Sequence, residues 1–516
     1  MALPWYSPEF PLNNPESSPK LVTTQKNYLW SLNSVRDILV KSNNLFKLPE
    51  RETENISLYD DYEEDSTFHS GLINKAFLPM RVTLMAVGRW PFPMKFRQLA
   101  SKHNQNQRHR SFSTRIRNYD STLKSPLWIY FGLTTAFIFF VLVMSTVGFF
   151  DFFLNWQLLP GCHWTTLPND IFHDNLVMFL LVWGCLVHGT VSSFSFLLNR
   201  RKVVRILNYW NVAADELLIA EVNSHRRFLI ASNVGYLLFL AMIYYAYTWK
   251  IPLVRDGAAL FGSLAILPLL PGHELKKHEI WKLRVFGVVT IIYAVYASRA
   301  FLFLFCFKCR LLRSLFRVWN SRLIRFLRRP EIDVNECKET TDRIERLESQ
   351  RLLKDMRILL KMVKLTDKMF ATVLQAYYAV QLLNMCFELY MLAKSGTEEF
   401  TRSDNSTKGL DIVAAVLTLV QNVYFFFTVS LDGAYVGEEA AKGLEALRCH
   451  YVSPSSSIHR KYLVYNLGTI YNQRIAVTGG KFFIIDRPFI ITVLGAVLTY
   501  FVIILQVGPS LQQQLP

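Results

Sequence analysis

The chain has 516 residues, of which 51% are hydrophobic and 19% are charged, against about 25% charged in an average soluble protein. The apolar residues occur in long blocks, which excludes a string of ordinary soluble domains and indicates a polytopic membrane protein. The net charge of +17, from 57 Lys and Arg against 40 Asp and Glu, would suggest a nucleic-acid partner in a soluble protein. We expect no such partner, because these charges gather on one side of the predicted membrane.

The N-terminal region has two parts. Residues 1–70 are rich in Pro, Ser and Asn and contain the acidic run Asp60–Asp65, which predicts a disordered cytoplasmic tail. No apolar stretch of signal-peptide type is found there, so we expect the first span to act as an anchor. Residues 71–126 begin with apolar and basic residues at helical spacing, which predicts an amphipathic cytoplasmic or interfacial segment.

Seven segments are long and apolar enough to cross the membrane, which takes about 20 residues for a hydrocarbon core of roughly 30 Å. The predicted spans are residues 127–150, 176–198, 228–249, 285–307, 369–392, 410–431 and 483–507. The apolar run 257–272 is shorter and contains Pro268 and Pro271. We predict that it is a loop at the membrane interface or over the outer face.

Basic residues in the connections predict the orientation, because Lys and Arg are retained on the cytoplasmic side. Counted over alternate regions that start with the N-terminal one, 46 of the 57 lie on one side and 9 on the other. The N-terminus is therefore expected in the cytoplasm and the C-terminus outside, the reverse of a G-protein-coupled receptor. The sequon at Asn405 then lies in an external loop, where it can carry an N-glycan.

The long basic connection 308–368 predicts a cytoplasmic helical extension. Apolar residues at helical spacing from Leu347 to Leu365 continue into the fifth span and need a partner. The candidate partners are the helical stretches 434–448 and 458–475 of another cytoplasmic connection, 432–482, so the two connections predict a helical anchor domain. A juxtamembrane helix attracted to anionic lipid is the alternative.

No pattern in the chain predicts catalysis. Cys306-Phe-Lys-Cys309 has the spacing of half a zinc or redox site, but no second pair accompanies it. Acylation at the membrane edge is the alternative for these thiols. Phosphate-binding glycine loops and hydrolase motifs are missing, so we expect no enzyme, no metal and no cofactor.

The last span carries the most informative pattern. From Pro488 to Val507 it has the length of a complete span, and Gln506 lies near its outer end. In a symmetric ring of such helices, Gln506 would lie beside Ile503 and Val507 and form a polar ring between apolar constrictions, which is typical of a gate. The alternative is that Gln506 lies in the membrane interface. Residues 508–516 are expected to be an extracellular tail.

This end of the chain resembles the insect gustatory receptor family. Thr499-Tyr500, five apolar residues and Gln506 resemble the family's C-terminal signature, with Val507 in place of its Phe. The resemblance to the family extends upstream through Ala476-Val-Thr-Gly-Gly-Lys-Phe-Phe. Glu438-Glu-Ala-Ala-Lys-Gly-Leu resembles a motif of the sugar-sensing branch, although that branch usually has Glu where Phe501 stands. Val493–Phe501 also resembles the related olfactory coreceptor.

The resemblance implies a ligand-gated, nonselective cation channel in the plasma membrane of sensory neurons, opened by a small tastant such as a sugar. It implies a homotetramer, or a heteromer with related receptors, around the seventh helix. Ile503, Gln506 and Val507 would line the gate, and residues 479–487 would form a short cytoplasmic helix. An olfactory-type channel, an accessory subunit and a transporter are the alternatives; a transporter would have an inverted repeat, which we do not find.

The family places its ligand pocket among the outer halves of spans two to six, where aromatic and uncharged polar residues suit a small polar ligand. The candidates in this chain are Trp183, Tyr244, Tyr293, Tyr378, Gln381, Asn384, Glu388, Asp411 and Gln421. Each of these residues can instead have a structural role, either in the aromatic belt at the membrane interface or in a hydrogen bond to another helix. Glu388 and Arg299 are costly to bury in a bilayer and must each have a partner or face water, and Arg299 is expected to be structural.

Overall fold

The computed structural model describes residues 126–155, 169–216, 280–328, 338–398, 405–449, 457–471 and 475–514, together with isolated positions and short pieces in 78–96, 117–119 and 227–242. These residues belong to one compact unit, Phe68–Pro516. The predicted tail 1–70, the loop 257–272 and Tyr244 lie outside the described residues, as does most of segment 71–126.

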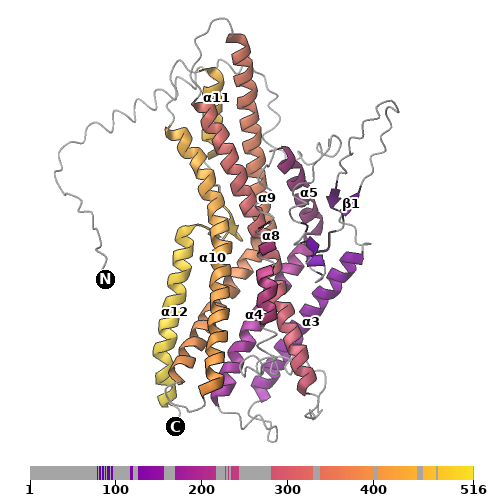
Figure 1. Ribbon diagram of the computed structural model, residues 1–516, viewed down its shortest axis with the longest axis vertical. Helices are drawn as coiled ribbons and strands as arrows, with labels where there is room; N and C mark the ends of the chain where they lie inside the picture. Colours follow the sequence, from indigo (N-terminus) through magenta and orange to yellow (C-terminus); the bar gives the residue numbers. More distant parts are fainter. Residues whose placement is uncertain are drawn as a thin grey trace, which may run out of the picture. The chain divides into compact units, whose positions relative to one another are not determined.

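The described residues form mainly long helices (Figure 1). They are α3 (Pro126–Asn155), α4 (Asn169–Leu198), α5 (Arg200–Glu216), α8 (Ile280–Leu327), α9 (Lys338–Glu398), α10 (Asn405–Cys449), α11 (Ile458–Tyr471) and α12 (Arg487–Gln514). Two short antiparallel sheets accompany them, β1 (Met94–Phe96) with β2 (Arg117–Tyr119) and β3 (Thr478–Gly479) with β4 (Phe483–Ile484).

Five predicted spans each lie within one helix: 127–150, 176–198, 285–307, 369–392 and 410–431. The third span, 228–249, is described at only some positions, so the count of seven stays a prediction. By length and composition, four stretches of the described chain can cross a membrane: Pro126–Phe150, Phe179–Leu198, Val285–Leu327 and Ala415–Arg448. Helix α9 is not among them, because its predicted span carries several polar residues, which are buried inside the protein.

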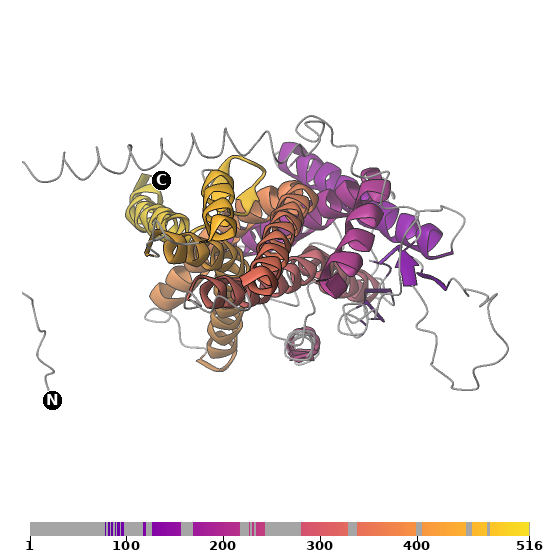
Figure 2. The same cartoon turned by 90° about the horizontal axis from the view of Figure 1, so that it is seen from above.

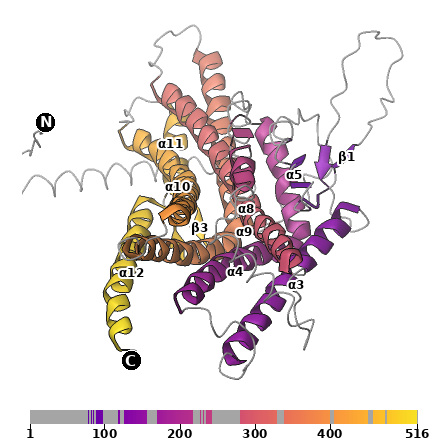
Figure 3. The ribbon, with the colours of Figure 1, turned by 60° about the horizontal axis from the view of Figure 1, so that its bottom comes forward.

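Helix α8 lies at the centre of the packed helices, and α3 and α12 lie at the edges. Helix α8 is in contact with α4, α9 and α10, and much of its surface is buried, whereas α3 packs on α4 and exposes most of its apolar residues. Helix α12 packs on α9 and α10. Figures 2 and 3 show α12 and α3 at opposite edges of the helical unit.

Helices α8, α9 and α10 are 48, 61 and 45 residues long, far more than the roughly 20 needed to cross a bilayer. Their extra lengths, residues 308–327, 338–368 and 432–449, pack together with α11, and we call this part the extension bundle. The apolar residues of α9 from Leu352 to Val363 are mostly buried in it, whereas Leu347 is 59% exposed.

Buried polar contacts join the helices of the extension bundle. Trp319 Nε1 donates to the carbonyl of Leu352 at 3.0 Å, and Arg460 of α11 pairs with Glu345 of α9 at 2.7 Å. Burial raises the pKa of Glu345, but hydrogen bonds from Ser457 and Arg460 outweigh that effect and hold its pKa below the usual value. The carboxylate therefore stays ionised and keeps α11 attached to α9.

The segment before α12 corrects one expectation. Residues 479–486 form no helix, and only Arg487 is helical, as the first residue of α12: β3 and β4 pair as a hairpin with Thr478 opposite Ile484. Gly480 and Lys481 both have positive φ, and Phe482 N donates to the carbonyl of Gly479 at 3.2 Å, a geometry typical of a type I′ turn. A helix is excluded there because it cannot include two consecutive left-handed residues.

The boundaries of the last span are also different from those expected. Helix α12 begins at Arg487, so the first residues of the predicted span 483–507 belong to the hairpin and its exit. It continues to Gln514, so most of the predicted tail 508–516 is helical. Pro488 lies in the first turn, where its missing N–H costs no hydrogen bond.

Gly479 allows the hairpin to close, and this gives a first testable prediction. A Cβ at Gly479 would lie 2.0 Å from Cζ of Phe483, so Gly479→Ala must displace that ring. We expect a loss of about 1–3 kcal/mol in stability, measured as a lower melting temperature in detergent. Gly468→Ala on α11 is the control, since its Cβ meets nothing within 4 Å. Equal melting temperatures for the two variants would contradict the prediction.

Candidate ligand site and pore helix

Four buried polar side chains from three helices form one hydrogen-bonded group, which we call the polar cluster: Arg299 (α8), Gln381 and Glu388 (α9), and Asn422 (α10). Arg299 Nη1 donates to Gln381 Oε1 at 2.9 Å, and Gln381 Nε2 donates to the carbonyl of Asn422 at 3.0 Å. Asn422 accepts from Arg299 Nη2 through Oδ1 and donates to Glu388 Oε1 through Nδ2. The amide of Asn422 thus lies between the two ionisable groups of the cluster.

Aromatic rings enclose the cationic end of the cluster. The guanidinium carbon of Arg299 is 5.6 Å from the ring centroid of Tyr377 and 4.9 Å from that of Phe425. Both distances allow cation–π attraction, which is strongest where water is excluded. Arg299 is only 4% exposed, so the rings and the two amides together replace its hydration.

Two polar atoms of the cluster make no hydrogen bond to the described residues. Arg299 Nε and Glu388 Oε2 are both buried, and neither has a hydrogen-bond partner among the described residues. Buried polar atoms are nearly always paired, so two orphaned atoms on oppositely charged groups in one cluster indicate a missing partner. A further group with a donor and an acceptor would satisfy both atoms.

Helix α4 closes one side of the cluster. A Cβ at Gly184 would lie 3.1 Å from Val380 Cγ1 and 3.2 Å from Asn384 Oδ1, so the missing side chain lets α4 approach α9 closely. One turn further along α4, the ring centroid of His188 lies 5.8 Å from that of Tyr377. The site is thus bounded by α4, α8, α9 and α10.

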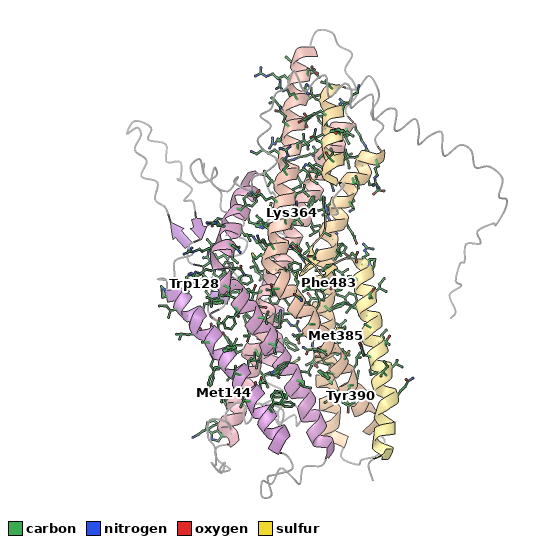
Figure 4. The ribbon with its side chains drawn as sticks, turned by 180° about the vertical axis from the view of Figure 1, so that it is seen from behind. Trp128, Met144, Lys364, Met385, Tyr390 and Phe483 are labelled. Carbon is green, nitrogen blue, oxygen red and sulfur yellow. The ribbon has the colours of Figure 1, made fainter. Side chains whose placement is uncertain are left out.

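A second group, which we call the aromatic cluster, lies between α9 and the start of α12. The Tyr378 ring centroid is 5.3 Å from that of Phe483 and 5.0 Å from that of Phe489, and the two phenylalanines stack at 4.5 Å. The Tyr378 hydroxyl makes a 2.9 Å hydrogen bond with Ser430 of α10. Figure 4, which labels Phe483, shows it beside the start of α12. Tyr378 therefore connects α9 to α10, to the hairpin and to α12.

Polar contacts hold the hairpin and the start of α12. Asp367 of α9 accepts from Thr478 N at 2.7 Å and from its hydroxyl at 2.8 Å. Asp486 caps α12, because its Oδ1 accepts from Phe489 N at 2.9 Å. Arg487 donates to both carboxylate oxygens of Glu438 on α10, at 2.6 and 2.9 Å. The start of α12 is thus attached to α9 and α10 at several points.

The predicted gate residues lie near the other end of α12. The side chains of Ile503 and Gln506 are exposed, Ile503 by 46%. Ile491, Leu498 and Val502 of the same helix are also largely exposed. The structure describes the backbone of Val507 but not its side chain. A large apolar helix face with one glutamine near its end is thus free of contact within the described part of this chain.

The comparison with family models identifies the chain. Residues 166–510 match the model described as 7tm Chemosensory receptor, which is more than half of the chain and includes both clusters. The chain belongs to this chemosensory receptor family. It is therefore a multi-pass membrane protein, consistent with its apolar helices.

Solved structures agree with this assignment at the level of the fold. The olfactory receptor OR5 from the insect Machilis hrabei in complex with eugenol is 16% identical, with a TM-score of 0.55 over 84% of this chain and 98% of that one. A second structure of the same receptor OR5 is 15% identical, with a TM-score of 0.51 over 85% of this chain and 100% of that one. The search of curated proteins gave no significant match.

The structure brings together some of the sequence-predicted ligand residues of this receptor. Gln381 and Glu388 belong to the polar cluster, and Asn384 is buried beside it, opposite Gly184. Gln421 is next to Asn422 in the chain, and its Nε2 is buried with no partner among the described residues. These positions keep the polar cluster as the candidate ligand site.

The other predicted ligand residues lie elsewhere. Trp183 Nε1 donates to Thr146 of α3 at 2.9 Å, and the Tyr293 ring packs against Phe137 of α3 at 6.3 Å. Tyr378 belongs to the aromatic cluster. Asp411 and the sequon residue Asn405 are in α10, but their side chains are not described.

Asn422 is the member of the polar cluster that sequence reasoning missed. It follows Gln421 in an apolar helix, and buried amides at such positions commonly bond across helices. Arg299 indicated that a partner was needed, but nothing in one sequence says which residue supplies it. Among the described residues, no group of three or more His, Cys, Asp or Glu is arranged to hold a metal ion.

Proposed function

We propose that this receptor is a subunit of a ligand-gated, nonselective cation channel of the plasma membrane of sensory neurons, opened by a small tastant. The proposal rests on one observation: a single helix, α9, contributes to the candidate ligand site and also contacts the segment before α12. One helix bears the polar cluster at Gln381 and Glu388, the aromatic cluster at Tyr378 and the hairpin contact at Asp367. A ligand that moves α9 at the polar cluster therefore acts on the start of α12.

The proposal assigns the pore to α12. Its exposed apolar face and Gln506 suit a symmetric ring of four copies, in which Ile503, Gln506 and Val507 line the gate and cations pass. A heteromer with related receptors would use the same face. The basic connections support an N-terminus in the cytoplasm and a C-terminus outside, which makes the extension bundle a cytoplasmic anchor domain in contact with membrane lipids.

The gustatory assignment, with a sugar as a candidate ligand, rests on the motifs around Glu438 and Gln506. An olfactory-type channel is the second candidate, because Val493–Phe501 also resembles the related olfactory coreceptor. The OR5 complex holds eugenol, and a comparable small organic molecule is then the expected ligand. The proposal includes no enzymatic activity and no cofactor in either case.

The gate gives the prediction that tests the channel. Replacing Gln506 with alanine removes the polar ring, so we expect a changed ratio of permeabilities for Na⁺, K⁺ and Ca²⁺, measured as a shift in reversal potential in oocytes. Gln513→Ala, the same substitution in the last turn of α12, should leave that ratio unchanged. The channel proposal fails if the receptor reaches the surface and no tested compound evokes a current. Uptake of labelled solute without conductance would indicate a transporter.

A further inference from the structure

The polar cluster also carries information about the chemistry of the ligand. Arg299 and Glu388 are 4% and 3% exposed and lie in predicted spans, where an ionised group is costly unless it has a charged or strongly polar partner. Each already uses part of its hydrogen-bonding capacity on Asn422. Each also keeps one buried atom without a partner among the described residues, Nε on Arg299 and Oε2 on Glu388.

Asn422 shows which groups the two charges select. Its amide offers an oxygen to the guanidinium and an N–H to the carboxylate. It thus acts as an uncharged stand-in for a molecule with an anionic acceptor at one end and a cationic donor at the other. Both bonds to the amide are already charge-assisted. A molecule with a full opposite charge at each end adds Coulomb attraction, which is larger in a buried site than in water, so it would bind both groups better than the amide does.

We propose that the ligand of this site is a zwitterion of the α-amino-acid class. Its carboxylate binds Arg299 and its ammonium group binds Glu388, while the Asn422 side chain turns away. The inference rests on the proposed function and deepens it by naming the ligand class. An α-amino acid carries the two charges on neighbouring carbons, a spacing similar to that of the oxygen and nitrogen of the amide it displaces.

Molecules with only one of the two charges fit less well. A carboxylic acid can bind Arg299 but takes the hydrogen bond of Asn422 away from Glu388 and offers no cation in return. An amine has the opposite defect, since it leaves Arg299 with a buried, uncompensated charge. A sugar supplies donors and acceptors but no charge, so it leaves the two buried ionisable groups without an oppositely charged partner.

The test compares matched compounds on the wild-type receptor in oocytes at neutral pH. The panel holds the common L-amino acids. It also holds 3-methylbutylamine, which is leucine without its carboxylate, and 4-methylpentanoic acid, which is leucine without its amine. Phenethylamine and 3-phenylpropanoic acid do the same for phenylalanine, and sucrose and eugenol represent neutral compounds. We expect at least one amino acid to evoke current at a half-maximal concentration more than tenfold below every singly charged or neutral compound.

Variants then assign the response to the cluster. Glu388→Gln keeps the shape of the side chain but removes the carboxylate. The half-maximal concentration of the active amino acid should therefore rise more than tenfold. That of 4-methylpentanoic acid or 3-phenylpropanoic acid, which have no ammonium group, should change less than threefold. Glu445→Gln, an exposed position of α10, is the control with the same change in charge and should respond as wild type. If Glu388→Gln fails to reach the surface, the comparison of compounds on the wild-type receptor still tests whether the ligand is an amino acid.

Two results would overturn the inference and leave the channel intact. One is gating by sucrose, eugenol or a singly charged compound at concentrations equal to or below those of every amino acid. The other is an amino-acid response that Glu388→Gln leaves unchanged. A surface-expressed receptor that stays silent with the whole panel would count against the proposed channel itself and would remove this inference with it.

Discussion

Replacing Arg299 with methionine is expected to destabilise the helical unit by about 2–6 kcal/mol, because the two buried amide oxygens of Gln381 and Asn422 lose their donor and each buried unpaired oxygen costs about 1–3 kcal/mol. The guanidinium donates to Gln381 and Asn422, and without it the Glu388 carboxylate stays buried with no cation nearby. The melting temperature of the tagged receptor in detergent, followed by size-exclusion chromatography, measures this loss.

Arg322→Met is the matched control for this prediction. Arg322 is also on α8 and pairs with Asp355, but at 3.4 Å and with 28% of its side chain exposed, so water replaces part of what is lost. We expect a clearly smaller fall in melting temperature. An equal or larger fall for Arg322→Met would mean that the polar cluster is not the costly site we infer.

Tyr378→Ala is expected to have the second largest effect, because it removes the ring that packs on Phe483 and Phe489. Truncating a buried aromatic side chain typically costs about 3–5 kcal/mol. Tyr378→Phe keeps the ring and removes only the hydroxyl that bonds Ser430, at a cost of about 1 kcal/mol. The same melting assay measures both losses.

The Tyr378 variants also test the connection to α12. If Tyr378 links α9 to the start of α12, ligand-evoked current per receptor at the surface should fall sharply in Tyr378→Ala and little in Tyr378→Phe. Tyr465→Ala on α11, where the side chain is 45% exposed, is the control and should keep both stability and current. Normal current per receptor in Tyr378→Ala would exclude this connection.

Much of the helical architecture could be predicted from the sequence, because apolar blocks of span length are a direct consequence of the bilayer as solvent. Five spans coincide with helices. The apolar stripe between Leu347 and Leu365 also predicted a helix that continues into the fifth span, and α9 runs from Lys338 to Glu398 without a break. These features depend on local pattern alone.

The contacts between distant residues could not be predicted. Arg299 and Asn422 are 123 positions apart, and a single sequence does not say that they meet. The hairpin did have a local signal, since Gly479-Gly480 is typical of a turn with positive φ. The family resemblance instead implied a short helix over 479–487, and the apolar run predicted a last span that begins at 483.

The continuity of α9 has a consequence for how the protein unfolds. Its 61 residues contribute buried side chains both to the extension bundle and to the polar cluster. Local unfolding usually follows breaks between elements, and α9 offers none between these two parts. The membrane-spanning helices and the extension bundle are therefore expected to lose structure as one cooperative unit, although the proposed topology places the former in lipid and the latter in water.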